Sequence, residues 1–168
     1  MHLLYWILCF VATFCIMEFM AWFSHKYIMH GFLWHLHEDH HKKDHDNWFE
    51  RNDTFFIFYA VVSMGFIITA ENTSFWQGWP IGLGIMAYGF TYFMVHDVFI
   101  HQRFKWFRNA NNKYAKGIRR AHKMHHKHLG KHDGESFGML YVHKKYWEKV
   151  RRDKQLMKGK KVEYAPEA

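Results

Sequence analysis

The sequence is poor in the residues that usually brace a small secreted protein. It contains 2 Cys and 2 Pro among 168 residues, and Cys9 and Cys15 both fall inside one apolar run. A disulfide framework or a thiolate metal site would need further cysteines, so both are excluded. We interpret the two cysteines as small apolar residues. At this length the chain is predicted to form one domain.

Basic residues are missing from two long stretches. Residues 1–23 and 52–101 contain no Lys or Arg, whereas 24–51 contain four and 102–168 contain nineteen. With six acidic residues, 102–168 carries a net charge of +13, against +8 for the whole chain. Uncharged runs rich in Phe, Trp and Tyr beside basic segments are typical of a membrane protein. Nucleic acid is therefore not an expected partner.

The stretches without Lys or Arg contain three runs that are long enough to cross a bilayer, at 3–23, 54–70 and 81–101. At about 1.5 Å per residue, the first run reaches roughly the 30 Å of a bilayer's hydrocarbon core. A signal peptide is disfavoured, because no Lys or Arg precedes this run and no small-residue cleavage site follows it. A fourth, partly inserted helix after 101 is left open. The predicted fold class is an all-α integral membrane protein with three to four transmembrane helices and a helical cap.

Three spans place 24–53 and 102–168 on the same side of the membrane, and every basic residue lies in these two pieces. By the positive-inside rule this side is cytoplasmic, which predicts a multi-pass protein of the inner (plasma) membrane. We expect one membrane domain over 1–151, with its cytoplasmic parts at 24–53 and 102–151. Residues 152–168 are interpreted as a frayed basic tail near the lipid headgroups.

Ten of the 16 histidines form four groups: HKYIMH at 25–30, HEDHH at 37–41, HDVFIH at 96–101 and HKMHH at 122–126. In each HxxHH group the three histidines share an arc of about 100° on a helix, which is a spacing typical of metal ligands. The predicted ligands are His25, His30, His37, His40, His41, His96, His101, His122, His125 and His126.

Histidines five residues apart are less favourable, since they lie about 140° apart around an ideal helix. They suit metal binding where the helix is irregular or where the two serve different metals. Their position strengthens the case, because both pairs end a predicted span at the same face. Ordinary interfacial histidines would require several coincidences of spacing and topology. We accept that ordinary interpretation for the ungrouped residues His2, His35, His45, His128, His132 and His143.

Imidazole ligands suit Zn, Fe, Cu or Ni rather than Mg or Ca. Ten of them are too many for one ion, so the sequence predicts two metals with room for water or dioxygen. Glu38, Asp39 and Asp97 either accept the second ring N–H of a ligand or are solvated acids. Glu18, the one charge in the first span, is interpreted as facing the helix bundle near the histidine-bearing end.

The boxes HKYIMHGF, HEDHH, YFMVHDVFIHQRF and AHKMHHKHLGK, followed by ESFG, resemble the carotenoid 3-hydroxylases of the membrane fatty-acid hydroxylase superfamily, from about residue 17 to about 142. The resemblance implies a non-haem di-iron monooxygenase. It would use dioxygen and electrons from an external donor such as ferredoxin to convert β-carotene through β-cryptoxanthin to zeaxanthin. It also implies that the ten histidines are iron ligands, with His35 as an alternative partner in the second box. Zinc can replace iron in recombinant protein.

Three other functions fit parts of this pattern. The first keeps the metals and changes the lipid to a fatty-acyl or sterol substrate of a hydroxylase or desaturase. The second is a membrane metal transporter, although that would place ligands along a path through the spans. The third, a zinc hydrolase, lacks the general base of an HExxH motif. The basic tail has two interpretations, attraction to headgroups, which we favour, and docking of an acidic electron carrier.

Overall fold

The computed structural model describes residues 2–42, 47–110 and 112–163, which form helices and loops and, over these ranges, no strand. Three helical stretches are long and apolar enough to cross a membrane: His2–Phe32, Asp53–Asn72 and Gly78–Ile100. They confirm the three predicted spans. Within the described residues no fourth helix of this kind follows them. The chain is a helical membrane protein.

The first span consists of α1, His2–Phe23, and a π-helix, η1, Ser24–Phe32. Gly31 has non-helical backbone angles, φ −105° and ψ −126°, and the chain turns there into α2, Trp34–His41. Because Gly lacks a Cβ, it tolerates such a break at little steric cost. The break lets α2 fold back toward the end of the first span.

The second and third spans form a hairpin of α3, Asp53–Asn72, and α4, Gly78–Phe93, with α4 continuing into a second π-helix, η2, Met94–Ile100. Small residues bring the two helices close together. The Ser63 hydroxyl donates to the Gly82 carbonyl at 2.7 Å, and a Cβ on Gly82 would lie 2.8 Å from the Ser63 carbonyl oxygen. Close packing through small residues is a usual way for membrane helices to associate.

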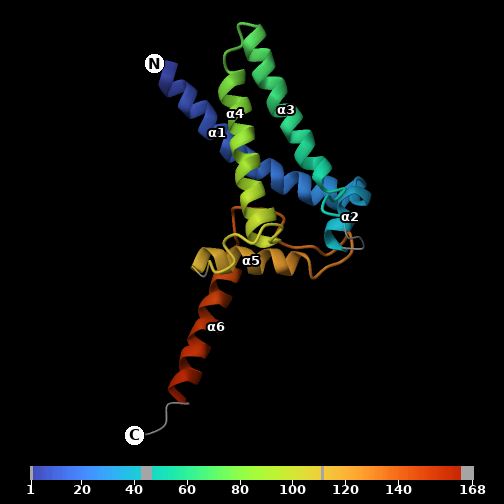
Figure 1. Cartoon of the computed structure of the whole chain (residues 1–168). Coiled ribbons are helices and arrows are strands. Elements are labelled where there is room, and N and C mark those ends of the chain that lie inside the picture. Colours follow the sequence, from blue (N-terminus) through green and yellow to red (C-terminus); the bar gives the residue numbers. More distant parts are fainter. Residues whose placement is uncertain (1, 43–46, 111, 164–168) are drawn as a thin grey trace.

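α1 crosses this hairpin and packs on α4 (Figure 1). Met17, Ile85 and Tyr88 form the buried apolar cluster between them. Gly84 lies at a close contact between the two helices: a Cβ there would be 2.8 Å from the Thr13 Cβ and 3.0 Å from the Phe10 carbonyl oxygen. The contact between α1 and α4 therefore requires glycine at position 84.

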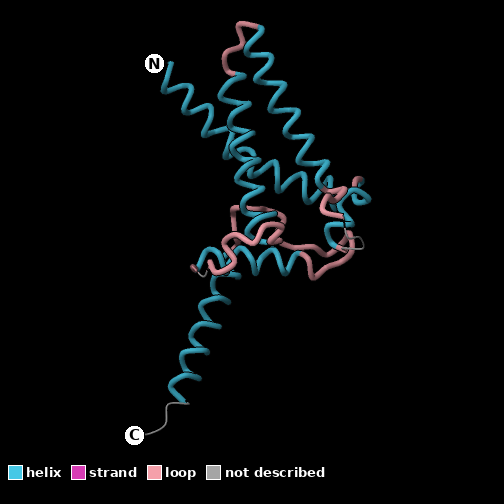
Figure 2. The backbone as a smooth tube through the Cα atoms, in the orientation of Figure 1, coloured by secondary structure: helices cyan, strands magenta, loops and turns pink. Residues whose placement is uncertain are grey.

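Two further helices, α5, Lys113–His125, and α6, Lys144–Glu163, follow the third span. The Asn112 side chain caps α5 by accepting from the Ala115 N–H at 2.7 Å. One face of α5 is buried and carries His122 and His125. In Figures 1 and 2, α5 lies across the end of the spans and α6 extends away from them. The α6 backbone continues to Glu163, past residue 152, where the sequence predicted fraying to begin.

We expect Gly84→Ala to lower stability by about 1–3 kcal/mol, because the added methyl overpacks the contact between α1 and α4. Gly65→Ala is the matched control, since nothing lies within 4 Å of a Cβ at that position of α3. The midpoint of thermal unfolding in detergent measures both variants. Equal midpoints would show that this helix contact tolerates a side chain.

Candidate metal centre

The two π-helices bring histidines five residues apart onto one side. π-helical hydrogen bonds join residue i to i+5, so these residues lie about one turn apart. The His101 N–H donates to the His96 carbonyl at 2.9 Å, and their ring centroids are 4.5 Å apart. The rings of His25 and His30 are 5.3 Å apart. The expected separation of about 140° is therefore wrong here, because it assumed an ideal α-helix.

Five of the predicted ligands meet in a first cluster. Their candidate ligand nitrogens all lie within 4.8 Å of one another, and all five side chains are buried. They come from η1, α2 and α5, three elements far apart in the sequence. The members are His25, His30, His37, His41 and His125.

Each ring of the first cluster uses Nδ1 to make a hydrogen bond that points away from the centre. Four rings donate to backbone carbonyls at 3.0 Å: His25 to Phe137, His30 to Lys131, His41 to His128 and His125 to Glu135. The fifth, His37, donates to the Asn52 side-chain oxygen at 2.7 Å. These partners fix the ring orientations, as the outer hydrogen bonds of metal ligands do.

The inner nitrogens of the first cluster then face one another. The Nε2 atom of His37 lies 3.1 Å from that of His25 and 3.2 Å from that of His41. A neutral imidazole carries one N–H, and Nδ1 already uses it, so the facing Nε2 atoms present electron pairs. Electron pairs at this distance repel unless a cation lies among them. The donor set therefore fits a metal ion of the kind that imidazole prefers.

The protonation state of these rings agrees with metal binding. Burial and neighbouring histidines lower the pKa of His41 to about 4 and that of His125 to about 2. Burial likewise holds the pKa of His37 well below its usual value. The three imidazoles are neutral at pH 7, so their electron pairs are available to a metal.

Four more predicted ligands form a second cluster, with ligand nitrogens again within 4.8 Å of one another: His40, His101, His122 and His126. The Nε2 atoms of His101 and His122 are 2.8 Å apart. Those of His40 and His126 are buried without a hydrogen-bond partner in the described part of the chain. Burial lowers the pKa of all four rings, that of His126 to about 3. These properties also fit a metal ion.

His96, the tenth predicted ligand, lies beside the second cluster rather than within it. Its ring centroid is 4.5–4.9 Å from those of His40, His101 and His122. The ring nitrogens of His96 are not part of the converging set.

Carboxylates hold the second cluster. The Glu50 carboxylate accepts from His40 Nδ1 at 2.7 Å, and that of Asp97 accepts from His96 Nδ1 at 3.2 Å. Arg103 joins these acids through ion pairs of 3.1 Å to Glu50, 3.2 Å to Asp97 and 3.0 Å to Asp53. Burial raises the pKa of Glu50, and the Arg103 guanidinium opposes that effect. The arginine thus compensates three acidic groups that would otherwise repel one another.

The acids suggested by sequence behave differently from one another. Asp97 does support a histidine, whereas Glu38 pairs with Lys42 at 2.9 Å on the surface. Asp39 is buried and accepts from the Arg51 N–H at 2.6 Å. His35 is exposed and does not join the second box's ligands, so the alternative suggested for it is wrong. His45 lies outside the described residues.

Sequence reasoning missed Glu50 and Asn52, which orient one ring in each cluster. Their position was the available signal, because they lie in the loop between the HEDHH box and the second span, at the histidine-bearing face. It also missed the carbonyls of residues 128–137. Every residue type carries a backbone carbonyl, so no sequence pattern marks the ones that accept these hydrogen bonds.

Glu18 faces the helix bundle, as expected, and fixes the segment that supplies these carbonyls. Its Oε1 atom accepts from three consecutive N–H groups at 2.9–3.0 Å, those of Met139, Leu140 and Tyr141. Its Oε2 atom accepts from the Tyr88 hydroxyl at 2.7 Å. One carboxylate therefore fastens the loop after the fourth histidine box to α1 and α4.

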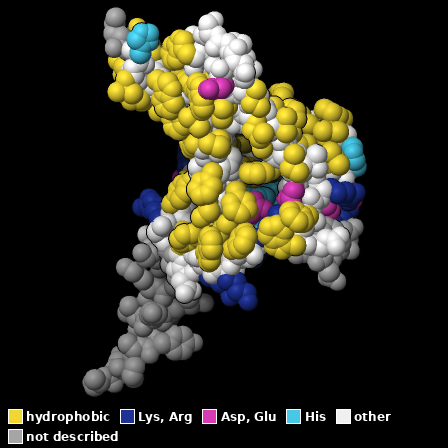
Figure 3. Space-filling model, turned by 45° about the horizontal axis from the view of Figure 1, so that its top comes forward, with side chains coloured by type: hydrophobic (Ala, Val, Ile, Leu, Met, Phe, Trp, Pro, Cys, Tyr) yellow, Lys and Arg dark blue, Asp and Glu magenta, His cyan; other side chains and the backbone are white. Residues whose placement is uncertain are grey.

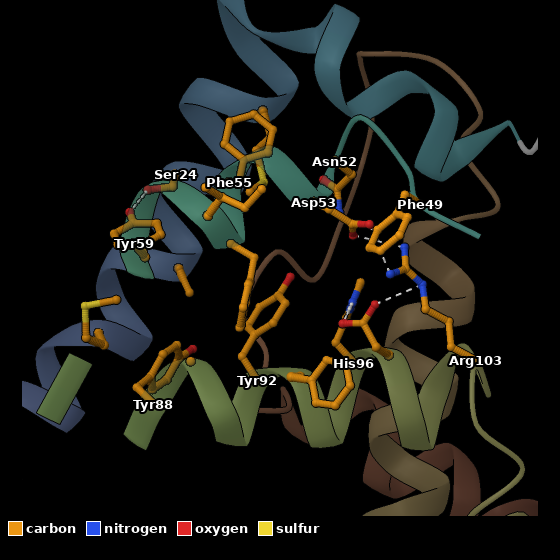
Figure 4. A pocket seen from close by; sticks show the side chains of 18 of the residues that line it. Ser24, Phe49, Asn52, Asp53, Phe55, Tyr59, Tyr88, Tyr92, His96 and Arg103 are labelled. Atoms are coloured by element: carbon orange, nitrogen blue, oxygen red, sulfur yellow. Dashed lines mark hydrogen bonds and ion pairs between the residues drawn. The ribbon is translucent and has the colours of Figure 1, made fainter. Parts of the chain in front are cut away.

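A cavity of about 260 Å³ lies between α1, α3 and α4 and reaches His96 at the edge of the second cluster. Its walls are mainly apolar and include Met17, Ala21, Phe55, Tyr88 and Phe93. In Figure 4, Tyr92 and His96 follow one another along its floor, with Arg103 at one end and the hydrogen-bonded pair Ser24 and Tyr59 at the other. An apolar molecule in this cavity would lie next to the metal ligands.

Comparison with known proteins identifies the family. A family model described as fatty acid hydroxylase matches residues 10–150. The chain belongs to the fatty acid hydroxylase family. As a family member, this hydroxylase is an oxidative enzyme, and its clustered histidines are suited to hold metal.

Several curated relatives are similar over most of this hydroxylase. "Beta-carotene hydroxylase" of Pantoea ananas is 41% identical over 126 residues, which cover 75% of this chain and 71% of the relative. "Beta-carotene hydroxylase" of Paracoccus sp. (strain PC1) is 36% identical over 134 residues, or 79% and 81% of the two chains. "Beta-carotene 3-hydroxylase 2, chloroplastic" of Arabidopsis thaliana is 36% identical over 74% of this chain and 41% of its own length. No solved structure matches.

We expect Glu50→Ala to lower metal affinity at the second cluster by about 10- to 100-fold, because His40 loses the acceptor that orients its ring. Glu38→Ala removes the same charge from a surface ion pair and is the control. Metal per chain, measured by elemental analysis after dialysis against a weak chelator, should fall from two ions toward one only in Glu50→Ala. Equal metal content in both variants would contradict this role of Glu50.

We expect Glu18→Ala to speed hydrogen exchange at the amides of residues 139–141 by roughly tenfold or more, since bonds to a charged acceptor contribute about 1.5–3 kcal/mol. Tyr88→Phe is the control, because it removes only the partner of the other carboxylate oxygen. Mass-detected exchange in detergent measures both. Unchanged exchange in Glu18→Ala would mean that other contacts fix this loop.

Proposed function

We propose that this chain hydroxylates C3 of carotenoid β-ionone rings, converting β-carotene through β-cryptoxanthin to zeaxanthin, with two iron ions, dioxygen and electrons from an external donor. One observation carries the proposal: an apolar cavity within the spans reaches His96, beside the second of two clusters of converging imidazoles. The names of relatives at 36–41% identity support the same substrate.

The ten histidines are proposed as the metal ligands. The first metal would be held by the five rings with carbonyl and amide partners, and the second by His40, His101, His122 and His126, with His96 beside them. Breaking an aliphatic C–H bond is beyond side-chain acids and bases, and iron supplies this oxidative chemistry when bound. Zinc suits the same imidazole set, so zinc in purified protein would not argue against this reaction.

The protein's own residues bind and orient the ring. Apolar walls favour a hydrocarbon over water, which keeps competing water away from the site. The outward hydrogen bonds of the ligands fix the imidazoles before substrate arrives, which lowers the reorganisation that catalysis requires. A carotenoid dissolves in the bilayer, so a cavity among membrane spans is where such a substrate would be captured.

The surroundings of the site suggest its orientation and electron donor. The basic residues 102–152 lie at the histidine-bearing end, so we assign that end to the cytoplasmic face of the inner membrane. Exposed Lys144, Lys149, Arg151 and Arg152 offer a positive surface on α6. Because α6 extends away from the spans, this surface suits an acidic ferredoxin-type donor better than the headgroups favoured from sequence. We retain 1–151 as one domain with a basic tail at 152–168.

The rival functions fit this geometry less well. A metal transporter needs ligands along a path through the membrane, whereas both clusters lie where the spans meet the cap. A fatty-acyl or sterol hydroxylase would use the same metal ligands. The similarity to proteins named as β-carotene hydroxylases favours the carotenoid.

The test is pigment analysis of a β-carotene-accumulating bacterium that expresses the intact chain, His40→Ala or His125→Ala. We expect mono- and dihydroxylated carotenoid only with the intact chain, because each variant removes a ring from one cluster. His35→Ala is the control, an exposed histidine outside both clusters, and should keep activity. Chromatography with mass detection measures the products.

Membrane expression of each variant must be confirmed by immunoblot. Unconverted β-carotene with the intact chain, despite an available electron donor, would overturn the proposed substrate. Full conversion by His40→Ala or His125→Ala would remove that histidine from the proposed ligands.

A further inference from the structure

The cavity beside His96 is large enough for only part of a long lipid. Its volume of about 260 Å³ is below the roughly 300–1,000 Å³ of pockets that enclose a whole drug-sized ligand. An extended polyene therefore cannot be enclosed. One end of such a molecule fits, and the remainder must stay outside.

The cavity also opens toward the lipid-facing surface. Phe49, Phe56 and Ile57 line it and yet are 71%, 48% and 60% exposed. Phe56 and Ile57 belong to the second span, where exposed apolar side chains contact lipid tails. Figure 3 shows a hollow bordered by hydrophobic side chains, with acidic side chains at its edge. A ligand dissolved in the bilayer can enter here without crossing water.

Among the described residues that line the cavity, Gly89 of α4 is the one without a side chain. A Cβ on Gly89 would have the Phe56 Cε2 atom at 3.8 Å as its nearest neighbour, an ordinary van der Waals contact. At Gly82 and Gly84 of the same helix, a Cβ would lie 2.6–2.8 Å from its nearest neighbour. Those two glycines are needed for helix packing, whereas Gly89 leaves space that belongs to the cavity.

We propose that this cavity binds the terminal ring of a membrane-dissolved lipid and that Gly89 sets the largest ring it admits. The ring enters between the exposed residues of α3 and comes to rest between α1 and α4, with its far edge toward His96 and the second cluster. The chain of the lipid remains among the bilayer tails. This inference rests on the proposed function only for the chemistry that follows binding.

The first experiment measures binding without turnover. The probe is β-ionone, which carries the ring on a short unsaturated ketone in place of the polyene chain. Equilibrium dialysis against the detergent-solubilised holoenzyme gives its Kd. We expect Gly89→Leu to weaken binding at least tenfold, since its side chain occupies the ring's space. Gly65→Leu, which adds the same side chain at an open, exposed position of α3, should bind as wild type.

The second experiment measures selectivity in cells. Wild type and Gly89→Ala receive carotenoids with either unsubstituted β rings or bulkier 4-keto β rings, and hydroxylated products are quantified. We expect Gly89→Ala to lower the ratio of keto-ring to β-ring hydroxylation several-fold. A folding defect would reduce both products together and leave their ratio unchanged, and iron per chain should equal that of wild type.

The outcomes separate the two proposals. Gly89-dependent binding of β-ionone without any hydroxylated carotenoid from wild type would keep the ring site and overturn the proposed function. Active wild type with unaltered binding and product ratio in the Gly89 variants would overturn the ring site. If Gly89→Leu fails to accumulate, the product ratio of Gly89→Ala decides.

Discussion

The structure depends on an electrostatic repulsion that it holds in place. Imidazole nitrogens converge in a buried volume, and their electron pairs face one another. In the first cluster every ring is held in this unfavourable arrangement by an outward Nδ1–H bond to a fixed oxygen. The other elements serve this arrangement: the break at Gly31 returns α2 to the first span, and α5 covers the centre from the cap side. Glu18 binds the end of the loop that supplies the four carbonyls. Bound cations would turn the repulsion into attraction, and metal binding would then stabilise the folded state.

The two clusters differ in the charge that surrounds them. The first is oriented by neutral oxygens, whereas the second has the Glu50 carboxylate on His40 and Asp97 on the adjacent His96. Partly buried carboxylates are costly unless a cation pairs with them, and Arg103 forms ion pairs of 3.0–3.2 Å with Glu50, Asp53 and Asp97. Two metals bound here would not be equivalent. The more negative surroundings would stabilise higher positive charge on a metal in the second cluster, the cluster next to His96 and the cavity.

The sequence predicts those features of the fold and the site that depend on residue type and on the spacing of residues. Long runs without Lys or Arg predicted the three spans. The HxxHH spacing placed the three rings of each box on one arc, but the structure divides each box between the two clusters. Sequence reasoning predicted His25 and His30 as ligands but not the π-helix that brings them together, because hydrophobic periodicity does not distinguish an α-helix from a π-helix. Glu50 and Asn52 were missed because one acid or amide in a polar loop has no periodic signature. The cavity could not be predicted, since it depends on how three helices are spaced.

The π-helical turns at the ends of two spans correspond to a sequence feature, the five-residue spacing of the paired histidines. A five-residue interval between paired ligands is compatible with one metal-facing surface only when the helix holds an extra residue in that turn. Deleting one residue between His25 and His30 would restore α-helical register, yet rotate everything that follows by about 100°. Gly31 and α2 would then be carried away from the centre. The site therefore requires the five-residue interval as well as the histidines themselves. Insertions or deletions should be tolerated in the polar loops of the hydroxylase but not between His25 and His30.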